Sequence, residues 1–321
     1  MLRSACLSVF VGLCCLLTAA RTAQAQQAFV IQGENKLALV QTDGKIAWEI
    51  PWGGIHDLHL LPGGTILLQR GSHEVVELDP KTGKVLWSYD SARQNGNDGK
   101  PVEVHALQPL ADGRVMIAES GPARIIEVDR EGKLHREIPL KVEHPHPHTD
   151  TRLARKIASG NYLVCHEGDG TVREYSGETG KVVWEYPVPM FGQAAKPGHG
   201  PEAFGNKTFA AVRLPGRDGK PGNTLLTTGN GHGLLEVTPE KEIVWELHQT
   251  DLPGITLAWV TTVEVLENGH YVFGNCHAGP GQPLLIEIDP ATKKVVWEFK
   301  GYDRFGNNAS NSQLAGVKTL R

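Results

Sequence analysis

The chain has 321 residues, of which 40% are hydrophobic and 21% are charged, and its formal net charge at pH 7 is -4. A chain of this length can bury a large core. A mildly acidic chain is a poor partner for nucleic acid, because neutralisation of phosphates supplies most of the non-specific affinity. We therefore expect no nucleic-acid partner.

The first 25 residues have the pattern of a secretory signal peptide. Arg3 is followed by an uncharged apolar stretch over residues 5–20, and Ala23-Gln24-Ala25 is a small-x-small cleavage site. That stretch is short for a membrane anchor, which is the alternative, and no later stretch is apolar enough to cross a bilayer. We predict cleavage after Ala25, no membrane span, a periplasmic or secreted protein, and a single domain over residues 26–321.

A repeated segment with tryptophan at one register runs through the rest of the chain. Its copies are GKIAWEI (44–50), GKVLWSY (83–89), GKVVWEY (180–186), KEIVWEL (241–247), KKVVWEF (293–299), and a variant, GKLHREI (132–138), with Arg136 at the tryptophan position. The number of residues between successive copies suits one propeller blade plus loops of variable length, which is typical of a β-propeller. We interpret the tryptophans as packing residues between neighbouring sheets.

Each copy is the last strand of a unit of short strands. Apolar and polar residues alternate along these strands, and Gly, Asp and Pro occupy the turns between them. In chain order, residues 27–52 contain only three strands, and four-stranded units follow; the unit that ends in KEIVWEL has its first turn widened by GRDGKPG (216–222). The strand missing from the first unit has one candidate, SNSQLAGVK (310–318). We predict an all-β, six-bladed β-propeller of four-stranded antiparallel blades, closed by this C-terminal strand joining the N-terminal blade.

Histidines concentrate in the connections that share one face of such a disc. Eleven of the fourteen fall between blades, or between the second and third strands of a blade: His56, His105, His144, His146, His148, His199, His248, His73, His166, His232 and His277. Histidine is a metal ligand and a general acid or base near neutral pH, so this face is where we expect the functional site.

Equivalent positions at the start of the innermost strands point to the channel mouth. His56 and His105 both stand eight residues before a turn glycine, Arg152 holds the same register, and His148 lies just before it. We take these four as candidate catalytic residues. The second-to-third-strand connections supply His166, His232 and His277, which we take as candidate metal ligands.

Two cysteines, Cys165 and Cys276, remain after the predicted cleavage. They follow the second strands of blades that are not neighbours, so we expect two buried thiols and not a disulfide. The tract HPHPH (144–148) reads as a metal-binding tract or a stiff connector, and we favour the connector, because alternate residues of an extended chain point in opposite directions.

The segments ELDPKTGKVLWSY and EIDPATKKVVWEF resemble the PQQ-like repeat of quinoprotein-dehydrogenase-like propellers. The resemblance spans nearly all of the predicted mature chain and implies a fold, not a chemistry. The PQQ dehydrogenases themselves have eight blades, a vicinal cysteine pair and a calcium site. The vicinal pair of this chain, Cys14-Cys15, lies in the predicted signal peptide. We therefore expect no PQQ and no other resident cofactor.

A second resemblance is carried by His56-Asp57, LLPGGTILL and ELDPKTGKVLW. They are similar to bacterial arylsulfate sulfotransferases, which are exported six-bladed propellers with a channel-mouth histidine that takes the sulfuryl group covalently. The resemblance implies His56 or His105 in that role, although this sequence has no counterpart of that family's extra N-terminal domain.

Three functions stay open on these observations. The first is a monomeric platform that binds a small anionic ligand or another envelope protein through the histidine-rich face. The second is sulfuryl transfer by a channel-mouth histidine. The third is a propeller that holds a divalent metal with the same histidines.

Overall fold

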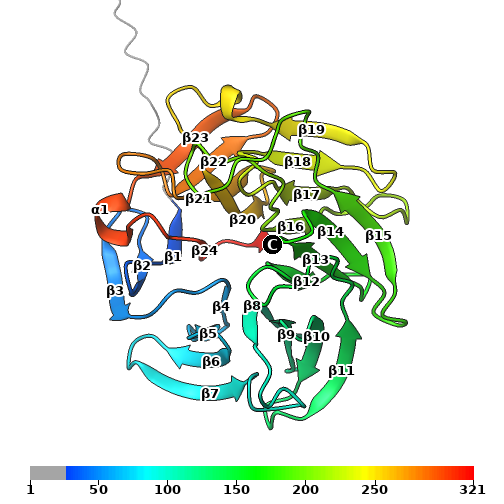
Figure 1. Cartoon of the computed structure of the whole chain (residues 1–321). Helices are drawn as coiled ribbons and strands as arrows, with labels where there is room; N and C mark the ends of the chain where they lie inside the picture. The colour runs from blue at the N-terminus through cyan, green and yellow to red at the C-terminus, as the bar shows by residue number, and fades with distance from the viewer. Residues whose placement is uncertain (1–26) are drawn as a thin grey trace, which may run out of the picture.

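Six antiparallel sheets form a ring around a central channel in the computed structural model, which describes residues 27–321 (Figure 1). The predicted signal peptide, residues 1–25, lies outside the described residues. The arrangement confirms the predicted six-bladed β-propeller. No helix among the residues from 27 onward combines the length and apolar character needed to cross a membrane.

The first three blades are built in chain order from the channel outward. Blade one contains β24 (Asn311–Ala315), β1 (Ala28–Gly33), β2 (Lys36–Val40) and β3 (Ile46–Pro51). Blade two contains β4 (Leu58–Leu60), β5 (Ile66–Arg70), β6 (Glu74–Asp79) and β7 (Lys84–Asp90). Blade three contains β8 (Glu103–Pro109), β9 (Val115–Ser120), β10 (Arg124–Val128) and β11 (Leu134–Pro139).

The other three blades repeat this order. Blade four contains β12 (Ala154–Lys156), β13 (Tyr162–His166), β14 (Thr171–Tyr175) and β15 (Val182–Pro187). Blade five contains β16 (Ala211–Arg213), β17 (Thr224–Thr227), β18 (Leu234–Val237) and β19 (Ile243–Leu247). Blade six contains β20 (Trp259–Leu266), β21 (Tyr271–Cys276), β22 (Leu285–Asp289), β23 (Lys294–Phe299) and a short fifth strand, β25 (Thr319–Leu320). A 3-10 turn spans Gln249–Asp251, and α1 spans Tyr302–Phe305.

The ring closes through the C-terminal strand, as the sequence predicted. β24 pairs antiparallel with β1 from Ala28↔Ala315 to Gln32↔Asn311. The chain then turns back, and β25 pairs with β20 at Val265↔Leu320, which the sequence analysis did not anticipate. The C-terminal end of the chain therefore lies in the channel, where Figure 1 shows it at the centre of the ring.

Packing between blades explains the alternation in the strands. A cluster of buried apolar side chains lies at each of the six interfaces between neighbouring blades of the described ring. Middle strands such as β9 are buried along their whole length, because a blade lies on each side. The outermost strand β3 alternates between partly buried and exposed residues, because only one of its faces meets a neighbour.

In three blades the repeated tryptophan joins its blade to the next, which supports the packing interpretation. The indole Nε1 of Trp87, Trp184 and Trp245 donates to a backbone oxygen in the following blade, at 2.7, 3.0 and 2.9 Å. Arg136, which replaces tryptophan in blade three, donates in the same way to the carbonyl of Gly177. In these four blades the position therefore holds a long side chain that ends in an N–H donor.

Candidate functional site

The candidate catalytic residues come from neighbouring blades and meet at one mouth of the channel. His56 stands two residues before β4, Arg152 stands two residues before β12, and His105 lies in β8 of the blade between them. His148 belongs to the connection between β11 and β12. Residues at equivalent positions of neighbouring repeats are therefore brought close together by the ring.

The rings of His56, His105 and His148 form a triangle, which we call the histidine triad. Their centroids are 4.4 Å apart for His56–His105, 5.4 Å for His105–His148 and 5.8 Å for His56–His148. One ring nitrogen from each residue lies within 4.8 Å of the other two. Among the residues from 27 onward, the triad is the one group of three or more histidine, cysteine or acidic side chains whose nitrogen, sulfur or oxygen atoms lie this close together.

A β-bulge at His105 aims its ring into the triad. Pairing between β8 and β9 passes from Val104↔Glu119 to Ala106↔Ala118, which leaves His105 unpaired. Bulges are common beside functional sites because the extra residue redirects a side chain. The His105 side chain is fully buried there.

The hydrogen bonds of His105 leave one of its nitrogens without a proper partner. Its Nδ1 lies 2.8 Å from the carbonyl oxygen of Thr151, which only accepts, so Nδ1 carries a proton. Its Nε2 lies 3.1 Å from the Glu103 carboxylate, which accepts a second contact from His148 Nδ1 at 2.7 Å. A neutral imidazole has one N–H and cannot donate to both acceptors. The contact with Glu103 needs a second proton or another cation.

Burial lowers the pKa of two imidazoles of the triad, those of His56 and His105. It lowers the pKa of His56 well below the usual value, with further contributions from His105 and then Arg152. Burial also lowers the pKa of His105, although the hydrogen bond to Glu103 acts in the opposite direction. The pKa of Glu103 falls to about 2, chiefly because of its hydrogen bond with His105. The site therefore places the neutral rings of His56 and His105 beside an ionised carboxylate.

Arg152 supplies a fixed positive charge beside the triad. Its Nε pairs with Glu167, and its Nη1 donates to the His148 carbonyl at 2.8 Å. The same Nη1 lies 3.1 and 3.4 Å from the two ring nitrogens of His105. Lys207 Nζ lies 3.4 Å from the other Glu167 oxygen, so Glu167 is shared between two cations.

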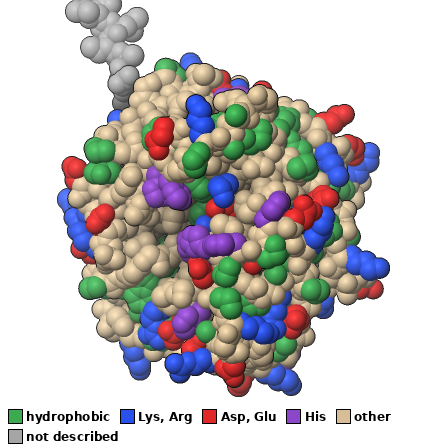
Figure 2. All heavy atoms as spheres, in the orientation of Figure 1, with side chains coloured by type: hydrophobic (Ala, Val, Ile, Leu, Met, Phe, Trp, Pro, Cys, Tyr) green, Lys and Arg blue, Asp and Glu red, His purple; other side chains and the backbone are tan. Residues whose placement is uncertain are grey.

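A cavity of about 510 Å³ opens in front of the triad, and we call it the histidine cavity. His56, His148 and Arg152 line it, together with His199 and His277. His199 stacks on Trp259 with ring centroids 4.9 Å apart, which gives one wall an aromatic surface. Figure 2 shows histidine side chains around the hollow at the centre of this face.

The three candidate metal ligands do not come together. His166 is buried within blade four, with Nδ1 2.7 Å from the Asp150 carbonyl and Nε2 2.9 Å from the Tyr175 hydroxyl, and burial lowers its pKa to about 4. His232 lines a different cavity, and His277 lies in the histidine cavity beside His199. The histidines whose ring nitrogens converge are instead three of the residues predicted for catalysis.

Sequence reasoning missed the groups that support the triad. Glu103 stands two residues before His105, and this short spacing was a signal that went unused. Glu167 directly follows His166 in the sequence, and its pairing with Arg152 comes from the fold. Cys165 and Cys276 are buried and unpaired, as expected, and burial raises the pKa of each thiol to about 12.

Solved structures with a similar fold include three propellers. A protein of unknown function from Bacteroides caccae is 24% identical, with a TM-score of 0.71 over 92% of this chain and 100% of that chain. A streptogramin B lyase is 15% identical, with a TM-score of 0.54 over 87% and 84%. The virginiamycin B lyase of Staphylococcus aureus is 13% identical, with a TM-score of 0.52 over 92% and 87%. At these identities the likeness concerns the fold.

None of these three is described as an arylsulfate sulfotransferase, so that expected similarity stays a prediction. Among curated proteins, none matches this chain in sequence. A family model described as the outer membrane protein assembly factor BamB, PQQ_2, matches residues 33–299. That match agrees with the expected PQQ-like repeat and spans well over half of the chain. The chain therefore belongs to the PQQ_2 family of the outer membrane protein assembly factor BamB.

Proposed function

We propose that this protein is an exported binding platform of the cell envelope. In this proposal the histidine triad holds a divalent transition metal, and the metal and Arg152 together bind a small anionic ligand. The observation that carries the proposal is the convergence of three ring nitrogens within 4.8 Å of one another at the wall of a cavity.

The chemistry of the donors favours a metal of the zinc, copper, iron or nickel group. Imidazole suits these ions, and three protein nitrogens leave a coordination position for a ligand. The Thr151 carbonyl bound to His105 Nδ1 leaves Nε2 as the donor, and such outer hydrogen bonds orient metal-binding histidines.

The charges around the cavity favour an anionic ligand. Arg152 and Lys207 share Glu167, and Glu103 is the carboxylate in contact with the triad. The two positive and two negative charges of these four groups cancel. A divalent cation would then give the cavity a net positive charge. The family description, which names an assembly factor of the outer membrane, supports the envelope location and a binding role.

Metal analysis tests the proposal directly. Residues 27–321, prepared without a metal-affinity tag and stripped by chelation, are loaded with Zn²⁺ and dialysed. We expect about one equivalent of Zn²⁺ in the wild-type protein and at least tenfold less in His56→Ala and His148→Ala. His135→Ala is the matched control, because His135 bonds Asp129 in the outer part of blade three. Retention of full zinc by His56→Ala, or no stoichiometric binding by the wild type, would overturn the metal site.

Sulfuryl transfer is a second candidate function, favoured by the neutral His56 ring beside a buried arginine. His56 Nδ1 is buried with no hydrogen-bond partner among the described residues, which suits a nucleophilic nitrogen. The test is the release of 4-nitrophenol from 4-nitrophenyl sulfate by metal-free protein with a phenolic acceptor. Turnover that is lost in His56→Ala and does not respond to zinc would favour transfer over the metal-centred platform.

A further inference from the structure

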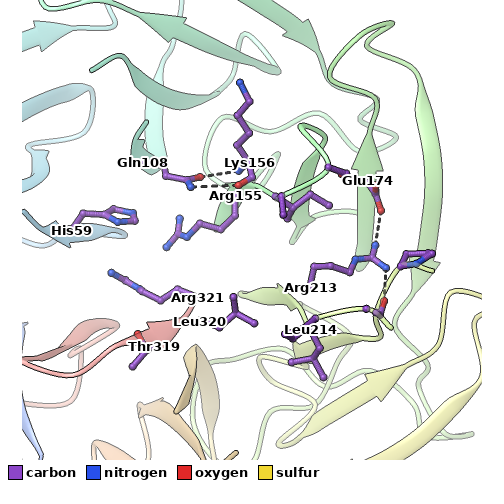
Figure 3. Close-up of a pocket in the computed structure, with 17 residues that line it drawn as sticks. His59, Gln108, Arg155, Lys156, Glu174, Arg213, Leu214, Thr319, Leu320 and Arg321 are labelled. Carbon is purple, nitrogen blue, oxygen red and sulfur yellow. Dashed lines mark hydrogen bonds and ion pairs between the residues drawn. The ribbon is translucent and has the colours of Figure 1, made fainter. Parts of the chain in front are cut away.

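A second cavity lies at the opposite mouth of the channel, and we call it the basic cavity. Its volume is about 610 Å³, and none of its lining residues lines the histidine cavity. It is bordered by the ends of the innermost strands that lie farthest from the triad, including β12 and β16. The blade colours run in opposite senses around Figures 1 and 3, so Figure 3 views the face opposite to that of Figure 1.

The widened turn after β16 forms one wall of the basic cavity. Leu214, Pro215, Gly216, Pro221 and Gly222 all line it. The motif GRDGKPG, which stood out in the sequence as an insertion, thus has a structural role on a face that otherwise carries short turns. Leu320 and Ile157 extend the apolar surface.

The cations of this cavity lie at its surface, in front of the carboxylates that pair with Arg155 and Lys156. Arg155, Lys156, Arg213 and Arg321 line it, against one lining acidic side chain, Glu174. The carboxylates that neutralise these cations are buried behind them. Asp57, which is 1% exposed, bonds Arg155 at 2.7 and 2.9 Å, and Glu127, which is fully buried, bonds Lys156 at 2.5 Å. The surface that a ligand meets is therefore positive.

His59 adds a polar group that lacks a partner. The residue is 9% exposed, and its Nε2 is buried with no hydrogen-bond partner among the described residues. The nearest carboxylate oxygen, on Asp57, is 3.8 Å away. A buried polar atom without a partner is unfavourable, and a polar group of a ligand in this cavity would supply the partner. In Figure 3 the side chains of His59, Arg155 and Arg321 extend into the same space.

From this arrangement we infer that the basic cavity binds an organic anion, a carboxylate or sulfonate carried on an apolar body. The anionic head lies between His59, Arg155 and Arg321, where guanidinium groups offer charge-assisted hydrogen bonds. The apolar body lies against Leu214 and the widened turn. The two parts match the composition of ligand sites, in which a few polar groups orient a ligand held mainly by apolar surface.

Calorimetric titration of metal-stripped protein with 2-naphthalenesulfonate tests this inference. We expect one site, with at least tenfold weaker binding of inorganic sulfate, which lacks the body, and of 2-naphthalenemethanol, which lacks the charge. Arg321→Gln should weaken binding of the sulfonate at least tenfold. His148→Ala, on the other face, is the matched control and should bind as the wild type does. The use of metal-free protein separates this result from that of the proposed metal site.

A second variant guards against loss of folding in Arg321→Gln. His59→Phe should also weaken sulfonate binding, because it removes a polar group at the anionic head, and it breaks no bond of Nε2, which has no hydrogen-bond partner among the described residues. Undetectable binding by folded wild-type protein at millimolar sulfonate would overturn the inference. So would unchanged affinity in folded Arg321→Gln or His59→Phe, or a loss of binding in His148→Ala.

Discussion

The rings of His56 and His105 meet edge to face with centroids 4.4 Å apart, although the two residues belong to different blades. Each stands eight residues before the glycine of the first turn in its blade, Gly64 or Gly113. Equivalent positions of neighbouring repeats therefore lie side by side at the channel mouth. Equivalent positions of two repeats thus supply two histidines of the triad, and the connection before β12 supplies the third.

Glu103→Gln should weaken zinc binding about 10- to 100-fold without removing it, because this carboxylate contacts two of the proposed ligands and holds none of the metal itself. The measurement is competition for Zn²⁺ with a chromophoric chelator. Glu131→Gln, in an exposed turn, serves as the control. Equal affinity in Glu103→Gln and the wild type would show that Glu103 does not support the ligands.

Stability should fall in mild acid, and His166 should carry part of the fall. Its folded pKa of about 4 lies below the ordinary value of 6.5, so the stabilisation is complete above pH 6.5 and is lost as the pH falls toward 4. This difference between the folded and ordinary pKa values of His166 corresponds to about 3 kcal/mol of unfolding free energy. His56 and His105 act with the same sign, because burial lowers their pKa values too. In His166→Gln, urea unfolding at pH 7.5 and 4.5 should show a smaller difference than in the wild type; an equal difference would contradict this role.

Trp184→Phe should destabilise the protein by about 1–2 kcal/mol, because the ring is largely kept while the Pro239 carbonyl in the next blade loses its donor. Trp184→Ala should cost more, about 3–5 kcal/mol, since the packing is also lost. Chemical denaturation measures both. If the phenylalanine variant matches the wild type, the hydrogen bond between the blades contributes nothing measurable.

A truncation after Asn308 should aggregate or unfold, because removal of β24 exposes the backbone edge of β1. A truncation after Lys318 is the control, since it keeps β24 and removes only β25 and Arg321. Size-exclusion chromatography and thermal melting compare the two. A monomeric product ending at Asn308 that melts like the full chain would show that closure by β24 is not required.

The repeat alone predicted most of the fold, because each blade is a local unit whose strands alternate and whose turns need glycine, aspartate or proline. The same periodicity predicted ring closure by β24 and the meeting of His56, His105 and Arg152 at one mouth of the channel. Such contacts follow from register, and register is visible in the sequence.

Other features depended on contacts between positions that no repeat relates. The bulge that aims His105, the sharing of Glu103 by His105 and His148, and the pairing of β25 with β20 arise from the packing of particular neighbours. Likewise, His166 was a candidate ligand by its place in a connection, yet its two hydrogen bonds within blade four occupy both nitrogens. Sequence determined which residues reach a channel mouth, while tertiary structure decided which of their nitrogens are free, because side-chain partners are set by three-dimensional neighbours and not by register.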